Sequence, residues 1–215
     1  MTYAVKEMFL TLQGEGVQSG RRAVFVRFAG CKLWSGREQD RASAICRFCD
    51  TDFVGTDGEG GGKFADAGAL AAAAAGFWGE GLDQRYVVLT GGEPMLQIDD
   101  AIVDALHGEG FMIAMESNGT LPAHPGIDWV CISPKAGSDV VQRSGDELKL
   151  VWPQPGDGYG AADVDAMEQW GFDNLLIQPL DDPHAGDNMQ AAIALVMARP
   201  RWRLTLQDHK HLGLR

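Results

Sequence analysis

Three of the four cysteines lie close together in the chain, at Cys31, Cys46 and Cys49. Thiolates bind soft metals, so a Cys-x2-Cys pair reached by a third cysteine favours an iron–sulfur cluster or a zinc ion over a disulfide framework. A 4Fe-4S cluster normally takes a cysteine on each iron, so three cysteines leave one iron free to bind a ligand that is not protein. In the zinc interpretation, a histidine such as His209 or His211 closes the shell. The cysteine loop alone leaves both metals open.

The fourth cysteine, Cys131, lies within the apolar run of residues 129–132. Free cysteine behaves as a small buried hydrophobe, so this position predicts core packing rather than metal binding. We therefore expect the other three thiolates to be the ligands.

The elements that must position these cysteines are predicted by short apolar runs. Seven such runs, rich in β-branched, aromatic and aliphatic residues, predict strands over residues 23–28, 86–89, 111–115, 128–132, 147–152, 174–177 and 202–206. Helices are expected between them, over residues 66–77, 95–107, 161–170 and 188–198. Residues 9–16 place two glycines around a carboxylate, which predicts a tight turn.

Polar side chains recur directly after several of the predicted strands, at Glu116, Asn118, Ser133, Lys135 and Gln178. In parallel α/β folds the sites are built at this edge, because the loops from every strand converge there. About seven strands and four helices, in fewer residues than the ~250 of a closed barrel, predict an α/β fold of the incomplete (β/α) barrel type. We expect residues 1–215 to form one domain.

Composition and charge narrow the class of protein. The formal net charge is -12, and Lys and Arg are scattered along the sequence. We therefore expect a small-molecule substrate and no binding to nucleic acid. No run approaches the ~18 apolar residues of a membrane span. Lys6 and Glu7 stand where a signal peptide would be apolar, so we expect a cytoplasmic protein with no membrane contact.

The three-cysteine loop, joined to the Gly91-Gly92-Glu93-Pro94 turn in a partial barrel, resembles the radical S-adenosylmethionine superfamily. The resemblance implies a 4Fe-4S cluster on the three cysteines, whose open iron chelates the amino and carboxylate groups of the methionine moiety. Gly92 would contact that amino group, and one electron would cleave the sulfonium to a 5′-deoxyadenosyl radical. The fourteen residues 32–45 between the first two cysteines exceed the superfamily's common spacing, so the conformation of this loop is not predicted.

Further motifs, in residues 12–16, 116–119, 133–135 and 207–210 and at Arg27, resemble the 7-carboxy-7-deazaguanine synthase family. This resemblance covers most of the chain. It implies ring contraction of 6-carboxy-5,6,7,8-tetrahydropterin to 7-carboxy-7-deazaguanine with loss of ammonia, in queuosine and deazapurine biosynthesis. It also implies Mg2+ dependence, regeneration of S-adenosylmethionine, a homodimer, and an electron donor such as flavodoxin or ferredoxin.

The resemblance implies three sets of site residues. Cofactor contacts are expected at Phe48, Cys49, Asp50, Gly92, Glu116, Asn118, Ser133, Pro134, Lys135 and Gln178, and Glu116 is also the expected catalytic residue. Substrate contacts are expected at Leu12, Gln13, Gly14, Glu15, Arg27, Thr90 and His209. Metal ligands are expected at Cys31, Cys46, Cys49 and, for Mg2+, Thr51.

The chemistry of these residues agrees with the implied substrate. Arg27 offers a fork of donors to a carboxylate, although a strand arginine also pairs with buried protein carboxylates. Gln13 and Glu15 offer acceptors to the N–H edge of a pterin. Thr51 is a hard oxygen ligand, and the substrate carboxylate would complete the Mg2+ shell.

Two other classes of function stay open at this point. A radical activating enzyme that acts on a partner protein would share the cluster and the Gly-Gly-Glu-Pro turn, but it has no need of Gln13, Glu15 and Arg27. A zinc-stabilised binding module would use the same cysteines. An anaerobically purified iron–sulfur protein is brown, whereas a zinc protein has no visible colour. The visible absorption spectrum therefore separates the zinc module from the other two classes.

Overall fold

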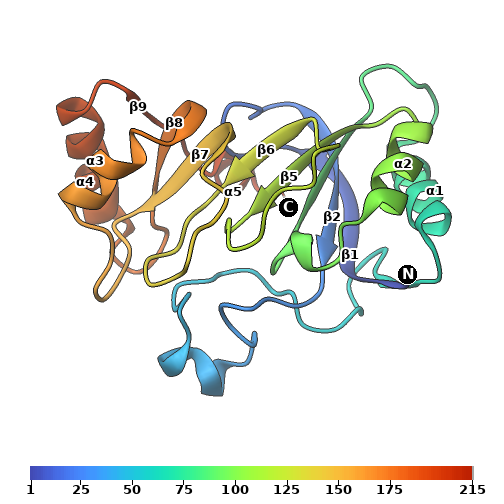
Figure 1. Ribbon diagram of the computed structural model, residues 1–215, viewed down its shortest axis with the longest axis horizontal. Coiled ribbons are helices and arrows are strands. Elements are labelled where there is room, and N and C mark those ends of the chain that lie inside the picture. Colours follow the sequence, from blue (N-terminus) through green and yellow to red (C-terminus); the bar gives the residue numbers. More distant parts are fainter. Residues whose placement is uncertain (215) are drawn as a thin grey trace.

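The computed structural model describes residues 1–214, which build one sheet of nine strands flanked by helices (Figure 1). The strands lie in the order β3-β1-β2-β4-β5-β6-β7-β8-β9. Their bounds are β1 (Tyr3–Leu12), β2 (Arg22–Phe28), β3 (Gly62–Phe64), β4 (Tyr86–Gly91), β5 (Met112–Ser117), β6 (Trp129–Ile132), β7 (Ser144–Trp152), β8 (Gly171–Pro179) and β9 (Trp202–Leu204).

The sheet is parallel from β2 through β9, and β1 and β3 add an antiparallel edge. An open sheet of mainly parallel strands is the incomplete (β/α) barrel that the sequence predicts, so this prediction is confirmed. The register aligns Arg27 with Thr90 and Glu116 with Cys131, so neighbouring strands end together. Their polar C-terminal ends therefore share one edge of the sheet.

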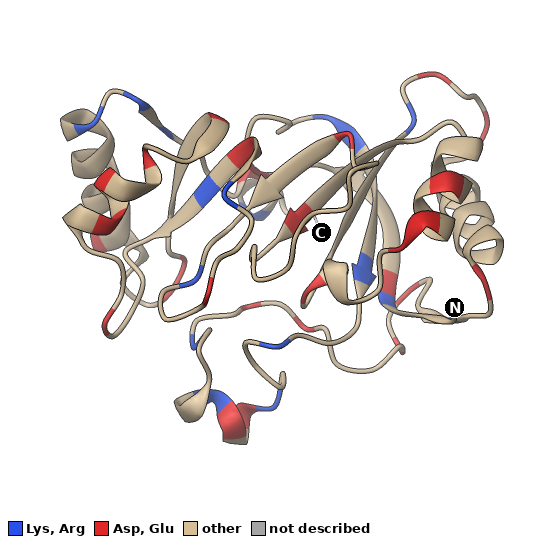
Figure 2. Ribbon diagram, in the orientation of Figure 1, with Lys and Arg blue, Asp and Glu red and all other residues tan. Residues whose placement is uncertain are grey.

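Five α-helices and two 3-10 helices are found in the described residues. They are η1 (Glu38–Ser43), α1 (Ala67–Trp78), η2 (Pro94–Leu96), α2 (Asp100–Gly108), α3 (Ala161–Met167), α4 (Ala185–Ala198) and α5 (Asp208–Leu212). Figure 1 shows α1 and α2 together at one end of the sheet and α3 and α4 at the other. Lys and Arg are scattered along the ribbon among the acidic residues (Figure 2).

Four details differ from the sequence predictions. Residues 9–12, predicted as part of a turn, complete the ten-residue strand β1, and β3 was not predicted, so nine strands replace about seven. The predicted helix over 95–107 divides into η2 and α2, because the Asp99 carboxylate caps α2 by accepting from the Ile102 amide at 3.1 Å. The short helix α5 follows β9, where no helix was predicted.

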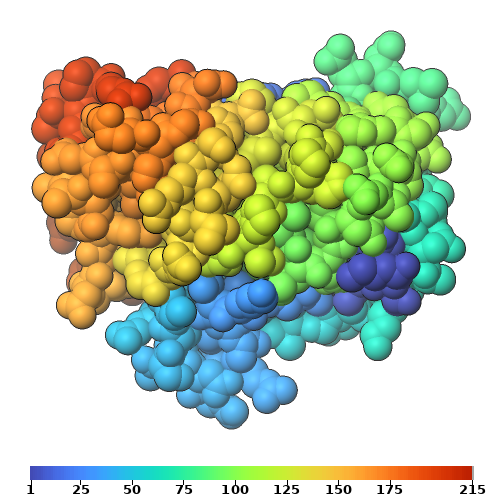
Figure 3. All heavy atoms as spheres, in the orientation of Figure 1, coloured from blue at the N-terminus to red at the C-terminus, as the bar shows by residue number. Residues whose placement is uncertain are grey.

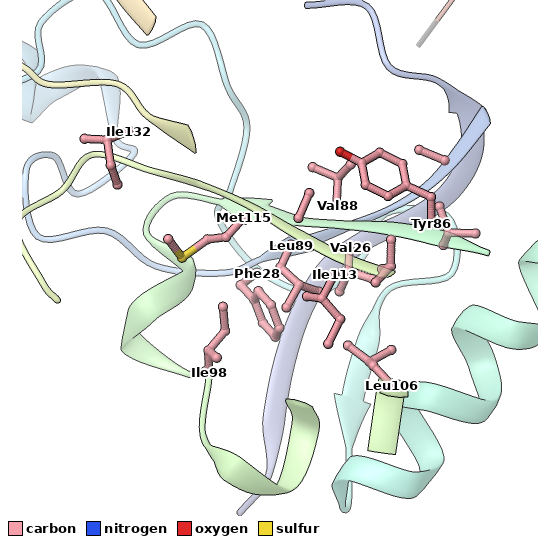
Figure 4. Packing of buried hydrophobic residues seen from close by; sticks show 14 of the residues in the cluster. Val26, Phe28, Tyr86, Val88, Leu89, Ile98, Leu106, Ile113, Met115 and Ile132 are labelled. Carbon is pink, nitrogen blue, oxygen red and sulfur yellow. The ribbon is translucent and has the colours of Figure 1, made fainter. Parts of the chain in front are cut away.

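The main hydrophobic core fills the space between the sheet and the helices. Figure 4 shows Val26, Phe28, Leu89 and Ile113 of the sheet close to Leu106 of α2, and these side chains are fully buried. A second, smaller cluster of Trp34, Ala44 and Phe53 lies within the cysteine loop and the segment that follows it. None of the helices in residues 1–214 is both long and apolar enough to span a membrane.

Candidate active site

A cavity of about 470 Å³ lies at the edge where the parallel strands end. It is lined by strand ends, by the loop between β1 and β2, by the cysteine loop and by residues 207–210. A cavity of this size is typical of sites for small molecules and cofactors. Figure 3 shows the cysteine loop, in light blue, protruding from the body of the molecule.

The structure brings nearly all of the predicted site residues to this one cavity. Every expected substrate contact, every expected metal ligand and all but one of the expected cofactor contacts line it. The exception among the described residues is Pro134, whose carbonyl instead accepts a hydrogen bond from Gln154 Nε2 at 2.9 Å. Their roles in binding stay predictions, but their convergence is a property of the fold.

The three thiols lie on the wall of the cavity beside Phe53 and Trp34 of the small core. All are free, Cys46 being buried and the other two partly exposed. A hydrogen bond from the Cys46 thiol lowers the pKa of Cys49 to about 6. The same hydrogen bond, together with burial, raises the pKa of Cys46, so of these two thiols Cys49 is the one that more readily forms the metal-binding thiolate.

The Gly-Gly-Glu-Pro turn packs directly against the start of the cysteine loop. The Glu93 amide donates to the Gly30 carbonyl at 2.9 Å. A Cβ added at Gly92 would lie 2.2 Å from the Gly30 oxygen and 2.9 Å from Cys31 Cβ, so only glycine fits without a shift. The turn can thus bring backbone close to a ligand held beside Cys31.

Glu93 fixes this turn to the end of β5. Its carboxylate is fully buried and accepts from Ser117 Oγ at 2.8 Å and from the amides of Asn118 and Met95, each at 3.0 Å. Burial raises the pKa of Glu93, but these three donors compensate for part of the lost hydration. Sequence reasoning gave Glu93 no role of its own.

Lys149 is the centre of a charge network at the floor of the cavity, and sequence reasoning also missed it. Its ammonium pairs with Glu15 and lies 3.1 Å from Glu116 Oε2, while the lysine side chain is 5% exposed. Gln13 Nε2 donates to Glu116 Oε1 at 2.8 Å, and Gln207 Nε2 donates to Glu15 Oε1 at 2.9 Å. The signal that could have found Lys149 is a lysine flanked by two leucines within a predicted strand.

Opposing effects set the charge states of this network. Burial by itself would raise the pKa of Glu15, but the Lys149 charge and hydrogen bonds from Lys149 and Gln207 lower it to about 2. Burial would lower the pKa of Lys149, but the carboxylates of Glu116 and Glu15 raise it well above its usual value. Both ions are therefore charged at neutral pH. Gln13 and Glu15, expected as acceptors for the substrate, already have protein partners.

Arg27 has a protein partner on one edge of its guanidinium. Its Nε donates to Glu7 Oε1 at 2.8 Å, and the two side chains are 20% and 16% exposed. The guanidinium carries two further nitrogens, which can donate to a carboxylate. Both explanations offered for this arginine, structural pairing and substrate binding, are compatible with its place on the cavity wall.

Residues 207–210 close the cavity from the side of the cysteine loop. Lys210 Nζ lies 3.1 Å from Asp50 Oδ2 and 2.6 Å from Asp181 Oδ2. His209 packs against Gly14, where an added Cβ would lie 2.3 Å from its Nδ1. These contacts join the segment after β9 to both the cysteine loop and the β1–β2 loop.

Two features fit S-adenosylmethionine. The Gln178 side chain is 5% exposed and lines the cavity, and its Oε1 is buried with no hydrogen-bond partner, so it can accept from an amine of a bound ligand. Lys135 Nζ lies 2.6 Å from Ser133 Oγ, which places a cation beside the cysteine loop where a carboxylate could bind.

The thiols fit a cluster with an open iron. Within residues 1–214, no three His, Cys, Asp or Glu side chains converge closely enough to hold one metal ion. Cysteine thiols are the ligands that iron–sulfur clusters take, and three of them would leave one iron of a four-iron cluster open. Cys131 is 4% exposed in β6, and its thiol donates to Glu147 Oε1 at 3.4 Å, away from the other three.

A cysteine loop and a Gly-Gly-Glu-Pro turn that meet at the open edge of an incomplete barrel define a radical S-adenosylmethionine enzyme. No protein-family model matches the chain. It is 58% identical to the 7-carboxy-7-deazaguanine synthase of Caulobacter vibrioides over 214 residues and 58% identical to that of Burkholderia multivorans, with 100% of each chain covered. A crystal structure of QueE from Escherichia coli is similar with a TM-score of 0.66 at 25% identity, over 97% of this chain and 95% of that one. The chain belongs to the 7-carboxy-7-deazaguanine synthase family.

Proposed function

We propose that this chain catalyses the ring contraction of 6-carboxy-5,6,7,8-tetrahydropterin to 7-carboxy-7-deazaguanine, with release of ammonia, in queuosine or deazapurine biosynthesis. The observation that carries the proposal is the single cavity that holds the three thiols, Gly92, Glu116 and Arg27 together. Full-length identity of 58% to enzymes of this name supports it.

In this proposal Cys31, Cys46 and Cys49 hold a 4Fe-4S cluster. Bound there, the cluster supplies the electron that cleaves S-adenosylmethionine. Gly92 leaves room for the methionine amino group, and Lys135 offers its ammonium to the methionine carboxylate. Gln178 accepts from the adenine amine through its unpartnered Oε1. The remaining cofactor contacts are expected at Phe48, Asp50, Asn118, Ser133 and Pro134.

The substrate is proposed to lie between the β1–β2 loop and the strand ends. Arg27 binds its carboxylate through the terminal guanidinium nitrogens while Glu7 holds Nε. Leu12, Gln13, Gly14, Glu15, Thr90 and His209 complete the proposed contacts. Glu116 is the proposed catalytic residue, because Gln13 and Lys149 fix its carboxylate where it can accept a hydrogen bond or a proton from a bound ligand.

Mg2+ is proposed to bind Thr51, which lines the cavity two residues after Cys49. Mg2+ prefers hard oxygen ligands and retains several waters, so one hydroxyl and the substrate carboxylate form a sufficient shell. In the absence of substrate we expect only weak Mg2+ binding.

The remaining proposals concern the whole protein. We propose that the chain is one cytoplasmic domain and a homodimer, and that flavodoxin or ferredoxin reduces its cluster. One sheet with one main core supports the single domain. Ile193 and Met197 of α4 are 37% and 81% exposed, and they form apolar surface that a second copy of the chain could cover. Size-exclusion chromatography with light scattering, which measures the molar mass in solution, tests the homodimer.

Anaerobic incubation with S-adenosylmethionine, dithionite, Mg2+ and the carboxytetrahydropterin tests the activity. We expect a product with the mass of 7-carboxy-7-deazaguanine together with ammonia. A protein that contains the cluster and cleaves S-adenosylmethionine, but leaves this pterin unchanged, would refute the proposed substrate.

A separate experiment tests the cluster ligands. Cys31→Ala should abolish the brown absorbance after reconstitution with iron and sulfide, whereas Cys131→Ala should retain it. Loss of iron from the Cys131 variant, with retention in the Cys31 variant, would show that the ligand assignment is wrong.

A further inference from the structure

The fourteen residues between Cys31 and Cys46 form a compact structure with a core of their own. Trp34 packs edge-on against Phe53, with ring centroids 5.7 Å apart, and Ala44 completes the cluster. The partly buried Cys31 and Cys49 pack against it. The insertion protrudes from the body of the molecule (Figure 3), but its apolar side chains pack against the metal ligands.

Arg41, in η1, is the side chain that joins this insertion to the Cys-x2-Cys turn. Its Nη1 donates to the carbonyls of Arg47 at 2.9 Å and Cys49 at 3.1 Å. Its Nε is held by the Glu38 carboxylate at 2.7 Å, and its guanidinium carbon lies 4.1 Å from the centroid of the Trp34 ring. The side chain is 30% exposed.

These contacts constrain the peptide units that orient the thiols. The carbonyls of Arg47 and Cys49 flank Phe48, in a turn that belongs to no helix or strand. Holding both carbonyls from one planar group fixes the backbone between them, and with it the direction of the Cys49 side chain. A planar fork stacked on an aromatic face can do this, whereas a lysine ammonium on a flexible stem cannot.

We propose that Arg41 is a positioning residue for the cluster and holds the Cys-x2-Cys turn in the geometry that binds iron. In this proposal the long insertion places the Arg41 side chain against that turn. This inference rests on the proposed 4Fe-4S cluster and deepens it. It assigns a task to the segment whose length departs from the superfamily's common spacing.

The test compares Arg41→Gln and Arg41→Lys with Arg37→Gln. Arg37 is an exposed arginine of the same insertion. Arg37→Gln therefore removes one positive charge, as Arg41→Gln does, but leaves the Arg41 guanidinium and its hydrogen bonds in place. In the holoprotein, release of iron to a chelator should accelerate on the order of tenfold in both Arg41 variants, as expected for loss of a hydrogen bond from a charged group. The electron paramagnetic resonance spectrum of the reduced cluster should also change. Arg37→Gln should match the wild type in both readouts.

Alkylation of the cluster-free full chain, mapped by mass spectrometry, gives a readout independent of the cluster. We expect Cys46, which is 5% exposed, to react faster in both Arg41 variants, while Cys131 in the main core stays protected. Wild-type behaviour of Arg41→Lys would overturn the proposal, because charge alone would then suffice. Equal exposure of Cys131 would overturn it as well, since the loss would then be global unfolding. If neither the wild type nor any variant takes up iron, the proposed function fails. The alkylation pattern then still shows whether Arg41 holds the Cys-x2-Cys turn in place.

Discussion

The ammonium of Lys149 lies 3.1 Å from the carboxylate of Glu116, and the same ammonium pairs with Glu15, so one buried cation holds two acidic side chains at the floor of the cavity. Glu15 comes from the β1–β2 loop and Glu116 from the end of β5. The ion pairs therefore define the position of the loop relative to the sheet, as well as the charge of the site.

Replacing Lys149 by Met should strongly destabilise the protein, because two partly buried carboxylates lose their buried cation. We expect a loss of about 3–5 kcal/mol in the free energy of unfolding, which is typical of a broken buried ion pair. Chemical denaturation measures it. Lys6→Met is the matched control, since Lys6 is also nearly buried but pairs with Asp52 and Asp57, which are 69% and 81% exposed. A smaller loss in the Lys149 variant than in the Lys6 variant would contradict the role of the network.

The stability should depend on pH through Glu15. Its pKa is about 2 in the folded protein, below its ordinary 4.5, so the unfolded chain binds the proton more tightly. The stabilisation is therefore present above about pH 4.5 and is lost as the pH falls towards 2. In Lys149→Met, burial should raise the pKa of Glu15 instead. Denaturation at several pH values should show the wild type and the variant converging on acidification, and parallel curves would contradict this assignment.

Arg27→Lys separates substrate binding from structural pairing. If the guanidinium binds the substrate carboxylate, the charge remains but the two-pronged hydrogen bond is lost, and catalytic efficiency should fall on the order of 10- to 150-fold. The melting temperature and the iron content should change little. Glu7→Gln, which removes the negative charge of Arg27's protein partner but keeps an acceptor oxygen, is the control. A large drop in melting temperature with a proportionate loss of cluster in the Arg27 variant would instead support a structural role.

Thr51→Ala should weaken the dependence of turnover on Mg2+ and leave the cluster in place. The reason is that the hydroxyl is the proposed protein ligand of the ion, and alanine offers no oxygen in its place. Turnover measured across Mg2+ concentrations checks this, with Thr51→Ser expected to restore the response. Thr56→Ala, in the same loop but not lining the cavity, should behave as the wild type. An unchanged Mg2+ response in Thr51→Ala would exclude the role.

The parallel part of the sheet and the place of the site were predictable because both depend on local patterns. Short apolar runs such as residues 86–89 become strands whether or not their neighbours are known. Polar residues that follow them, such as Glu116 and Gln178, then reach one edge through the topology of parallel sheets.

What could not be predicted depends on partners distant in the chain. The two flanking leucines mark Lys149 as an unusual lysine, but its partners cannot be inferred locally because the carboxylates are 134 and 33 residues away in sequence. The strand β1 contains Lys6 and Glu7, which interrupt its apolar pattern. Lys6 is buried and Glu7 partly buried, and their partners are Asp57 and Arg27. The contacts of α5 likewise come from distant segments, namely the β1–β2 loop, Asp50 and Asp181.

The β1–β2 loop meets the described segment that follows β9 through four hydrogen bonds, one of them from Ser19 Oγ to Asp208 Oδ2 at 2.6 Å. Gly16 donates to Thr205 Oγ1 at 2.8 Å, the Asp208 amide donates to the Gly14 carbonyl at 2.8 Å, and Gln207 donates to Glu15. During translation the cysteine loop leaves the ribosome long before residues 205–210 do, at rates of about 5–20 residues per second. The cavity wall therefore closes only after nearly all of the described chain has been synthesised. Through that interval the three thiols lie beside an incomplete wall, open to delivery of iron and equally open to oxidants.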